Sequence, residues 1–256
     1  MVTASQASMR AVFFVIRTLN KWVLGASALL VLVAFWNRND LPRNIAFRTE
    51  LQDAPRQTRT ADPPFTVDYA GVTYRVEPQF AYDLYGMIVS YRLHDGESLM
   101  HRRGNDHLNV ADLCVVWSDT AMSPTLSNVS FWNGIFTCNF STRDSEAWAK
   151  LKMNEVSNNH LITADDSIRD RVAGVAVGDQ VHLRGLLARY GSGNGVRGTS
   201  TTRDDVGDGA CETIFVEQFD VLEPARGAWR TALYAALATF ALAVLVHFRL
   251  PYRPYA

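Results

Sequence analysis

Two long apolar runs, one near each end, constrain the fold of this chain more than any other feature. The first covers residues 22–36 without a charged side chain, and the second covers residues 231–248, interrupted only by His247 near its end. A helix that crosses a bilayer needs about 20 apolar residues, because it rises about 1.5 Å per residue. The two runs therefore predict membrane-spanning helices over residues 18–36 and 229–248.

Residues typical of a membrane–water interface flank both runs. Trp22 and Trp36 bracket the first run, and Trp229 and Tyr234 lie at the start of the second. Trp and Tyr are enriched in aromatic belts at the headgroups, and the long side chain of Lys21 can reach the same region. We expect these five residues to anchor the two helices at the faces of a lipid bilayer.

Two other interpretations of the runs are weaker. Helices buried in a soluble protein are usually shorter and carry a polar stripe. A cleaved signal peptide needs a small-x-small site, but the residues after Trp36 are Asn-Arg-Asn-Asp. Residues 11–16 form a further apolar patch, which favours an interfacial helix within the N-terminal tail, residues 1–21.

The side of the membrane is predicted from length rather than from charge. The tails carry Arg10, Arg17, Lys21, Arg249 and Arg253 near the spans, and the loop side carries Arg38, Arg43, Arg48, Arg226 and Arg230. The numbers of basic residues on the two sides are equal, so the positive-inside rule does not predict the orientation. Long loops, however, are translocated largely regardless of charge. We expect tails 1–21 and 249–256 in the cytoplasm and the middle domain outside it, in the periplasm if the membrane is a bacterial inner membrane.

The middle of the chain has the pattern of a β-rich domain. Four prolines predict an extended linker over residues 37–64. Alternating apolar residues then begin, with a hairpin or bulged strand around Gly71, and the domain is expected to run over residues 65–224. Capping residues predict short helices near residues 144–155 and 165–173. The fold class expected is two transmembrane α-helices flanking a mainly-β (α+β) extracytoplasmic domain.

Residues 177–222 resemble part of the small OB-fold barrels. The turn Gly178-Asp179 leads into a strand containing Val181, Leu183 and Gly185, and residues 214–222 form a closing strand. In OB folds a strand of the first kind pairs with a later strand of the second kind. The resemblance implies an OB-like β-barrel, a fold that often binds oligonucleotides or oligosaccharides on one face. Fold alone implies no activity, and no functional residue follows from it.

Three cysteines lie in the middle domain: Cys114, Cys138 and Cys211. In an oxidising compartment two of them are expected to pair and one to remain. Cys138–Cys211 and Cys114–Cys138 are both possible pairings from the sequence. Buried free thiols are the alternative, and a catalytic thiol would need a base beside it.

His94, His101 and His107 are the candidate metal ligands, because they lie close together in a polar segment. None of them shows the spacing of a known metal motif, so scattered surface histidines are the simpler interpretation. The acidic clusters at residues 165–170 and 204–208 lack a calcium-loop pattern and are expected to be solvated loops.

A net charge of −1 offers no basic surface for nucleic acid. With no convergent catalytic motif and no cofactor indicated, the first functional hypothesis is a non-enzymatic accessory protein. Its two anchors would present the β domain to a partner protein in the membrane or envelope, with the six tryptophans and other aromatics available for an interface. The alternatives are an extracytoplasmic metal- or thiol-dependent enzyme and a ligand-binding sensor.

Overall fold

The computed structural model describes residues 4–42, 45–94, 105–193, 195–202, 207, 210–225 and 227–250, with side chains from Val12 onward. The chain forms two compact units. The first comprises Met1–Asp40 and Arg226–Ala256, and the second comprises Leu41–Ala225. Each unit has its own packing and is described separately below.

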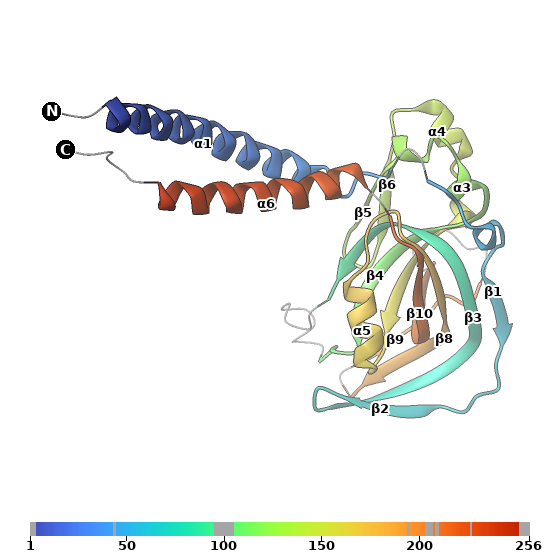
Figure 1. Ribbon diagram of the computed structural model, residues 1–256. Helices are drawn as coiled ribbons and strands as arrows, with labels where there is room; N and C mark the ends of the chain where they lie inside the picture. Colours follow the sequence, from blue (N-terminus) through green and yellow to red (C-terminus); the bar gives the residue numbers. More distant parts are fainter. Residues whose placement is uncertain are drawn as a thin grey trace. The chain divides into compact units, whose positions relative to one another are not determined.

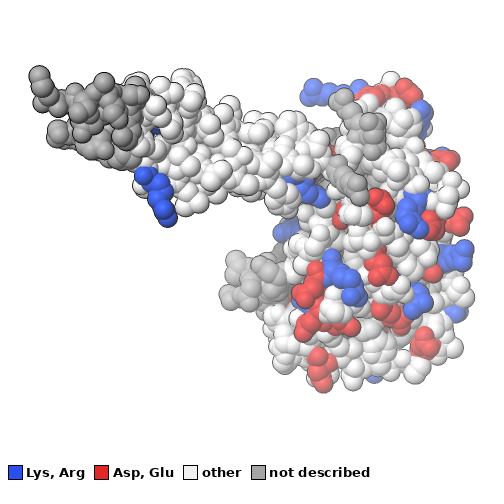
Figure 2. Space-filling model, in the orientation of Figure 1, with Lys and Arg blue, Asp and Glu red and all other residues white. Residues whose placement is uncertain are grey.

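The first unit is a pair of long helices that pack against each other, α1 (Ala4–Trp36) and α6 (Ala228–Arg249) (Figure 1). Residues Val12–Trp36 and all of α6 are long and apolar enough to cross a membrane. The expected interfacial patch at residues 11–16 is continuous with α1 rather than a separate helix. Figure 2 shows a surface without charge along most of the helical pair on the face in view.

The two helices meet along a narrow face of small and polar side chains. On α1 the buried residues Asn20, Ser27 and Ala34 are spaced by seven, and on α6 Ala236 and Ala243 are buried with the same spacing. Small side chains allow two backbones to approach closely. The Asn20 side chain donates a hydrogen bond from Nδ2 to the carbonyl of Ala243, 3.0 Å away.

The five expected interface residues lie on the outside of this helical pair. The side chains of Trp22, Trp36 and Tyr234 are 75%, 85% and 66% exposed, and Lys21 and Trp229 are also exposed. Outward-facing aromatic side chains of this size would be costly in water, so their exposure is consistent with a lipid surrounding.

The second unit is a mixed β-sheet domain. Its main sheet contains β1 (Arg56–Arg59), β2 (Phe65–Tyr69), β3 (Val72–Leu93), β4 (Asn109–Val116), β7 (Val156–Ile162), β8 (Gln180–Ser192), β9 (Gly195–Arg197) and β10 (Cys211–Glu223). A separate two-stranded sheet pairs β5 (Ser130–Asn133) with β6 (Cys138–Ser141). The segment expected to be a plain linker thus contains β1, which pairs with β3, and the 3₁₀ turn η1 (Thr49–Gln52).

Five strands of the main sheet close into a ring in the order β3-β4-β7-β10-β8, because β3 pairs with both β4 and β8. All pairs in the ring are antiparallel except β7 with β10, which run parallel. β3 has 22 residues, which is long enough to pair with both β4 and β8. The strand continues past Pro78, where its register with β8 shifts. Proline is tolerated in a strand at such an irregularity, where no ladder hydrogen bond is required.

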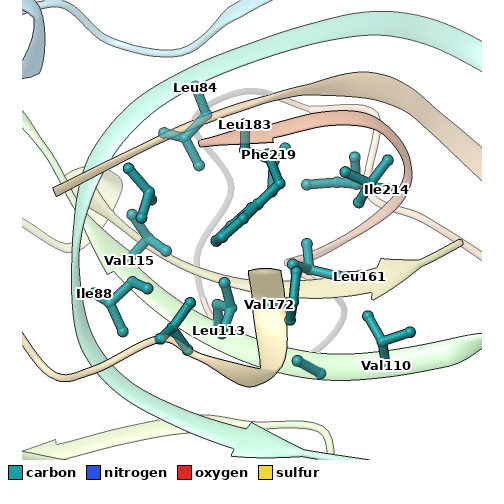
Figure 3. Close-up of a cluster of buried hydrophobic side chains, with 14 of the residues drawn as sticks. Leu84, Ile88, Val110, Leu113, Val115, Leu161, Val172, Leu183, Ile214 and Phe219 are labelled. Atoms are coloured by element: carbon teal, nitrogen blue, oxygen red, sulfur yellow. The ribbon is translucent and has the colours of Figure 1, made fainter. Parts of the chain in front are cut away.

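The core lies inside this ring, where side chains of all five strands meet (Figure 3). Phe219 of β10 is fully buried and points into the cluster. Helix α5 (Asp166–Ala173) adds Ile168 and Val172. The Asp165 carboxylate caps α5 by accepting the backbone N–H groups of Ser167 and Ile168, a common arrangement at helix starts.

The two ends of the β domain, near Pro42 and Ala225, meet at the turn that contains Gly178. Gly178 has φ +92°, and a Cβ there would lie 3.0 Å from Ala225 and 3.2 Å from Pro42. The neighbouring Asp179 side chain accepts hydrogen bonds from the backbone N–H groups of Ala176 and Ala225. The Gly-Asp turn therefore fixes both ends of the domain together, and the left-handed φ explains the glycine.

An insertion of mixed structure separates β4 from β7. It contains α3 (Ser118–Met122), η2 (Leu126–Asn128), the β5–β6 hairpin, α4 (Ser145–Lys150) and η3 (Met153–Glu155). A disulfide between Cys114 of β4 and Cys138 of β6 ties the hairpin to the main sheet, with the two Cα atoms 5.5 Å apart. Of the two pairings open from sequence, the structure contains this one.

Candidate thiol site

A row of polar side chains crosses three neighbouring strands on the face of the sheet that points away from the core. On β4 and β7, Asp112 lies opposite His160. On β7 and β10, Asn158 lies opposite Cys211. Alternate residues of a strand point to the same face, so these four side chains share one face, while their neighbours Leu113, Leu161 and Ile214 point into the core.

His160 and Asp112 form a buried, hydrogen-bonded pair. His160 Nδ1 lies 2.6 Å from Asp112 Oδ1, and His94 Nε2 lies 3.0 Å from the other carboxylate oxygen, Oδ2. Burial alone would raise the pKa of Asp112, but the two histidines outweigh it and hold that pKa well below its usual value. Asp112 is therefore a carboxylate that fixes the orientation of the His160 ring.

The thiol of Cys211 and the imidazole of His160 line a common cavity, and the two side chains interact. Asn158 Nδ2 is 3.7 Å from Cys211 Sγ, and the thiol donates to the carbonyl of Phe136 at 3.5 Å. Cys211 is the cysteine outside the disulfide, and it is partly exposed.

His160 holds a proton more strongly than an ordinary histidine in this arrangement. Burial lowers the pKa of His160, but Asp112 and Cys211 raise it more strongly, to about 9. A protonated imidazole beside a cysteine stabilises the thiolate form, which is the nucleophile in cysteine-dependent catalysis. The three side chains thus have the order carboxylate, imidazole, thiol, the order that triad chemistry uses.

The thiol opens into a cavity of about 360 Å³. Its walls come from five parts of the chain: Asn109, Phe136, His160, Tyr190, Arg197, Gly198, Thr199, Ser200, Cys211 and Thr213. The ring of Phe136 meets the His160 ring edge-on, with the two ring centres 5.6 Å apart. The Arg197 guanidinium lies 4.6 Å from the centre of the Phe136 ring. Phe136 has φ +58°, which is unusual for an aromatic residue, and it is found where the hairpin turns toward Cys211.

Buried charges at the edge of the cavity fix Arg197. Its Nε lies 2.9 Å from Asp106 Oδ2, and Asp106 also accepts the hydroxyl of Tyr190 at 2.9 Å. Tyr190 and Arg197 line a second, adjoining cavity of about 230 Å³. Arg197 is therefore held in place as a rigid wall between the two cavities.

The expected histidine cluster does not form a metal site among the residues the structure describes, where no group of three possible ligands converges. His94 belongs to the Asp112 pair. His107 donates its backbone N–H to the Tyr74 hydroxyl, and His101 lies outside the described residues. The acidic residues 204, 205 and 208 also lie outside them, while Asp165 is a helix cap.

Comparison of the chain with protein-family models, with curated proteins and with solved structures gives no match.

Proposed function

We propose that the β domain is a thiol-dependent enzyme of the acyl-transfer class. Cys211 is the nucleophile, His160 is the general base and acid, and Asp112 is the positioning residue. The observation that carries this proposal is the place of His160, hydrogen-bonded to Asp112 at 2.6 Å and in contact with Cys211 at the mouth of a cavity. Of the functions considered from sequence, this is the thiol-dependent enzyme rather than the metal-dependent one.

The chemistry follows from the order of the three groups. The Cys211 thiolate attacks the carbonyl carbon of an ester, thioester or amide, and the electron pair moves onto the oxygen. The tetrahedral intermediate then collapses, the bond to the leaving group breaks, and His160 gives its proton to that group. His160 then takes a proton from a water molecule, the resulting hydroxide attacks the thioester, and the C–S bond breaks to release the acid and restore the Cys211 thiolate beside protonated His160.

Asn158 is the side chain best placed to stabilise the oxyanion. Its Nδ2 is 3.7 Å from Cys211 Sγ, within reach of an oxygen on a carbon bonded to that sulfur. Asn133 Nδ2 donates to Asn158 Oδ1 at 3.2 Å, which turns the NH₂ group of Asn158 toward Cys211. A preorganised donor of this kind contributes about 100- to 1,000-fold to the rate of acyl transfer.

The cavity limits the size of the substrate. Ligand pockets usually enclose roughly 300–1,000 Å³, so 360 Å³ is at the small end of the range. The aromatic faces of Phe136 and Tyr190 favour an apolar acyl group. We infer that the enzyme accepts a short acyl chain, with the leaving group outside the cavity.

Trapping the acyl-enzyme tests this function. The full-length protein in detergent is mixed with p-nitrophenyl acetate, and the modified residue is identified by mass spectrometry. We expect an acetyl group on Cys211, none in Cys211→Ala, and acylation slowed at least about 100-fold in His160→Gln.

A second histidine–carboxylate pair provides the matched control. His182 Nε2 lies 2.9 Å from Asp83 Oδ1 and stacks on Tyr85, away from any cysteine. His182→Gln should therefore acylate at the wild-type rate. Acylation of wild type that is no faster than that of His160→Gln would contradict the proposed role of Cys211.

The finer account of the fold is also a proposal. We infer that the five-stranded ring is an OB-type barrel, a fold built from five strands in a Greek-key order. The pairing of β8 with β10 and the closure of β8 on β3 support it.

We further propose that α1 and α6 span a membrane with the β domain on its non-cytoplasmic side. Their exposed apolar surfaces support the first part, and the Cys114–Cys138 disulfide, which needs an oxidising compartment, supports the second. A bacterial inner membrane with a periplasmic domain satisfies both conditions.

A second role, as an interaction subunit, is favoured by one observation. The insertion between β4 and β7 exposes Trp132, Ile135 and Trp148, which are 49%, 62% and 60% accessible. Large exposed apolar side chains of this kind mark protein interfaces. Native gels of gently solubilised membranes test it: a partner should be retained by wild type and lost with Trp148→Ser, whereas a lone monomer in every mild detergent would exclude it.

A further inference from the structure

The disulfide and the free thiol belong to one row of the sheet. Cys114 on β4 and Cys211 on β10 both lie opposite Asn158, on either side of β7. Neighbouring strands are about 4.8 Å apart, so the Cα atoms of these two cysteines are separated by about 10 Å. A disulfide needs Cα atoms within about 7 Å, so Cys114 and Cys211 cannot bridge directly.

Cys138 lies on a different element, the β5–β6 hairpin, which contacts both cysteines of the row. The β5–β6 hairpin places it 5.5 Å from Cys114, Cα to Cα, in a pair with Asn133. The same hairpin contacts the free thiol, since the carbonyl of Phe136, two residues before Cys138, accepts from Cys211 Sγ at 3.5 Å. Asn133 also reaches Asn158, the residue that separates Cys114 from Cys211.

The hairpin is also an element that can shift. It is a two-stranded sheet of four residues per strand, separate from the main sheet. An isolated two-stranded hairpin is only marginally stable, so its position depends on the disulfide and on a few side-chain contacts. Because Phe136 of this hairpin already contacts Cys211, a shift of the hairpin is the movement that would bring Cys138 to Cys211.

We propose that Cys211 undergoes thiol–disulfide exchange with the Cys114–Cys138 bond. The Cys211 thiolate attacks Cys138 Sγ, a Cys138–Cys211 bond forms, and the bond to Cys114 breaks, leaving Cys114 as a thiolate that takes up a proton. One disulfide replaces another, so no external oxidant or reductant is needed. His160 promotes the attack because it pairs with the attacking sulfur.

The exchange provides a reversible block on the site. With Cys211 in a disulfide the nucleophile is absent, so acyl transfer stops until Cys114 attacks the new bond and returns the thiol. The regulatory role of the exchange rests on the proposed function in acyl transfer. The exchange itself requires only the three cysteines and His160.

Disulfide mapping of the full-length protein tests the exchange. Wild type is incubated without added oxidant, and Cys114→Ala and Cys138→Ala are incubated with oxidised glutathione. Free thiols are then blocked at low pH with N-ethylmaleimide, and unreduced peptides are identified by mass spectrometry. We expect a Cys138–Cys211 peptide as a minor species in wild type and as the main one in Cys114→Ala. In the matched variant Cys138→Ala, Cys114 and Cys211 should remain unlinked to each other.

Absence of the Cys138–Cys211 peptide from both wild type and Cys114→Ala would overturn the proposal, and so would a Cys114–Cys211 peptide in Cys138→Ala. The result is independent of the acylation assay. Acetylation of Cys211 without exchange removes only this inference, and exchange without acetylation removes only the proposed enzyme.

Discussion

At the scale of the residue, His160 links the carboxylate of Asp112 to the thiol of Cys211. Asp112 is 1% exposed and stays ionised because two histidines surround it. Burial lowers the pKa of His160, but its interactions with Asp112 and Cys211 raise that pKa more strongly, so His160 holds its proton. Each charge is therefore stabilised by the next, and removing one of them changes the protonation of the others.

This coupling makes stability depend on pH. The pKa of His160 rises from 6.5 to about 9 on folding, so its contribution is fully present below pH 6.5 and is lost as the pH rises toward 9. The pKa of Asp112 is lowered from 3.8, so its contribution is present above pH 3.8 and is lost in more acidic solution. Urea unfolding of the full-length protein, followed by tryptophan fluorescence, should show a loss of stability between pH 6.5 and 9.

Asp112→Asn should remove most of that pH dependence, because an amide cannot hold the imidazolium. His182→Gln is the control and should keep it. A wild-type stability that stays constant from pH 6.5 to 9 would contradict the charged pair.

The sequence could indicate part of this site. The sequence predicts the closing strand over residues 214–222, which begins close to Cys211, and a catalytic thiol there would need a base beside it. What the sequence could not give is the register: Asp112, His160 and Cys211 are up to 99 positions apart, and only the pairing of β4 with β7 and of β7 with β10 brings them together. Those pairings depend on the packing of the whole ring.

At the scale of the element, the closeness of β8 to β10 depends on Gly185. A Cβ at this position would lie 2.1 Å from the carbonyl oxygen of Phe215, where the backbone cannot easily give way. Gly185→Ala should therefore lower the free energy of unfolding by about 1–3 kcal/mol or more. Gly193→Ala is the control, since nothing lies within 4 Å of the added carbon. Equal melting temperatures for the two variants would exclude this close approach.

The helical pair depends on one buried polar contact. Asn20→Leu removes the hydrogen bond from Nδ2 to the Ala243 carbonyl and inserts a branched side chain at a close crossing. Interhelical hydrogen bonds in membranes contribute about 0.6 kcal/mol, with a maximum of about 1.7. Energy transfer between probes on α1 and α6 in lipid vesicles should fall in Asn20→Leu and stay unchanged in Leu29→Ala, which alters an exposed position. Unchanged transfer in both variants would argue against a specific crossing.

Local patterns predicted most elements but not their partners. The hairpin around Gly71 is confirmed as β2 and β3, with Ala70 and Gly71 at positive φ. The helix expected near residues 144–155 forms only over Ser145–Lys150, as α4 capped by Asp144. The continuation of β3 through Pro78 was not predicted, because a proline usually ends a strand and its bulge is set by the partner β8. The strand β1 was also not predicted, because its four polar residues, RQTR, become a strand only through the edge of β3.

At the scale of the whole molecule, the two units have different surfaces. Charged side chains of both signs cover the face of the β domain seen in Figure 2, and the helices lack them over most of their length. A reporter fused at residue 128 tests the proposed topology. Alkaline phosphatase should be active there and a cytoplasmic reporter inactive, since the β domain is proposed to lie outside the cytoplasm. The reverse pattern would place the Cys114–Cys138 pair in a reducing compartment and contradict the proposal.

The most direct test of the central claim is the rate at which iodoacetamide alkylates Cys211 as the pH is varied. If His160 pairs with the sulfur, wild type should react at least about tenfold faster than His160→Gln at pH 6.5, with His182→Gln equal to wild type. The difference should disappear above about pH 9, where His160 loses its proton. Equal alkylation rates for wild type and His160→Gln at pH 6.5 would contradict the thiolate–imidazolium pair and the enzyme built on it.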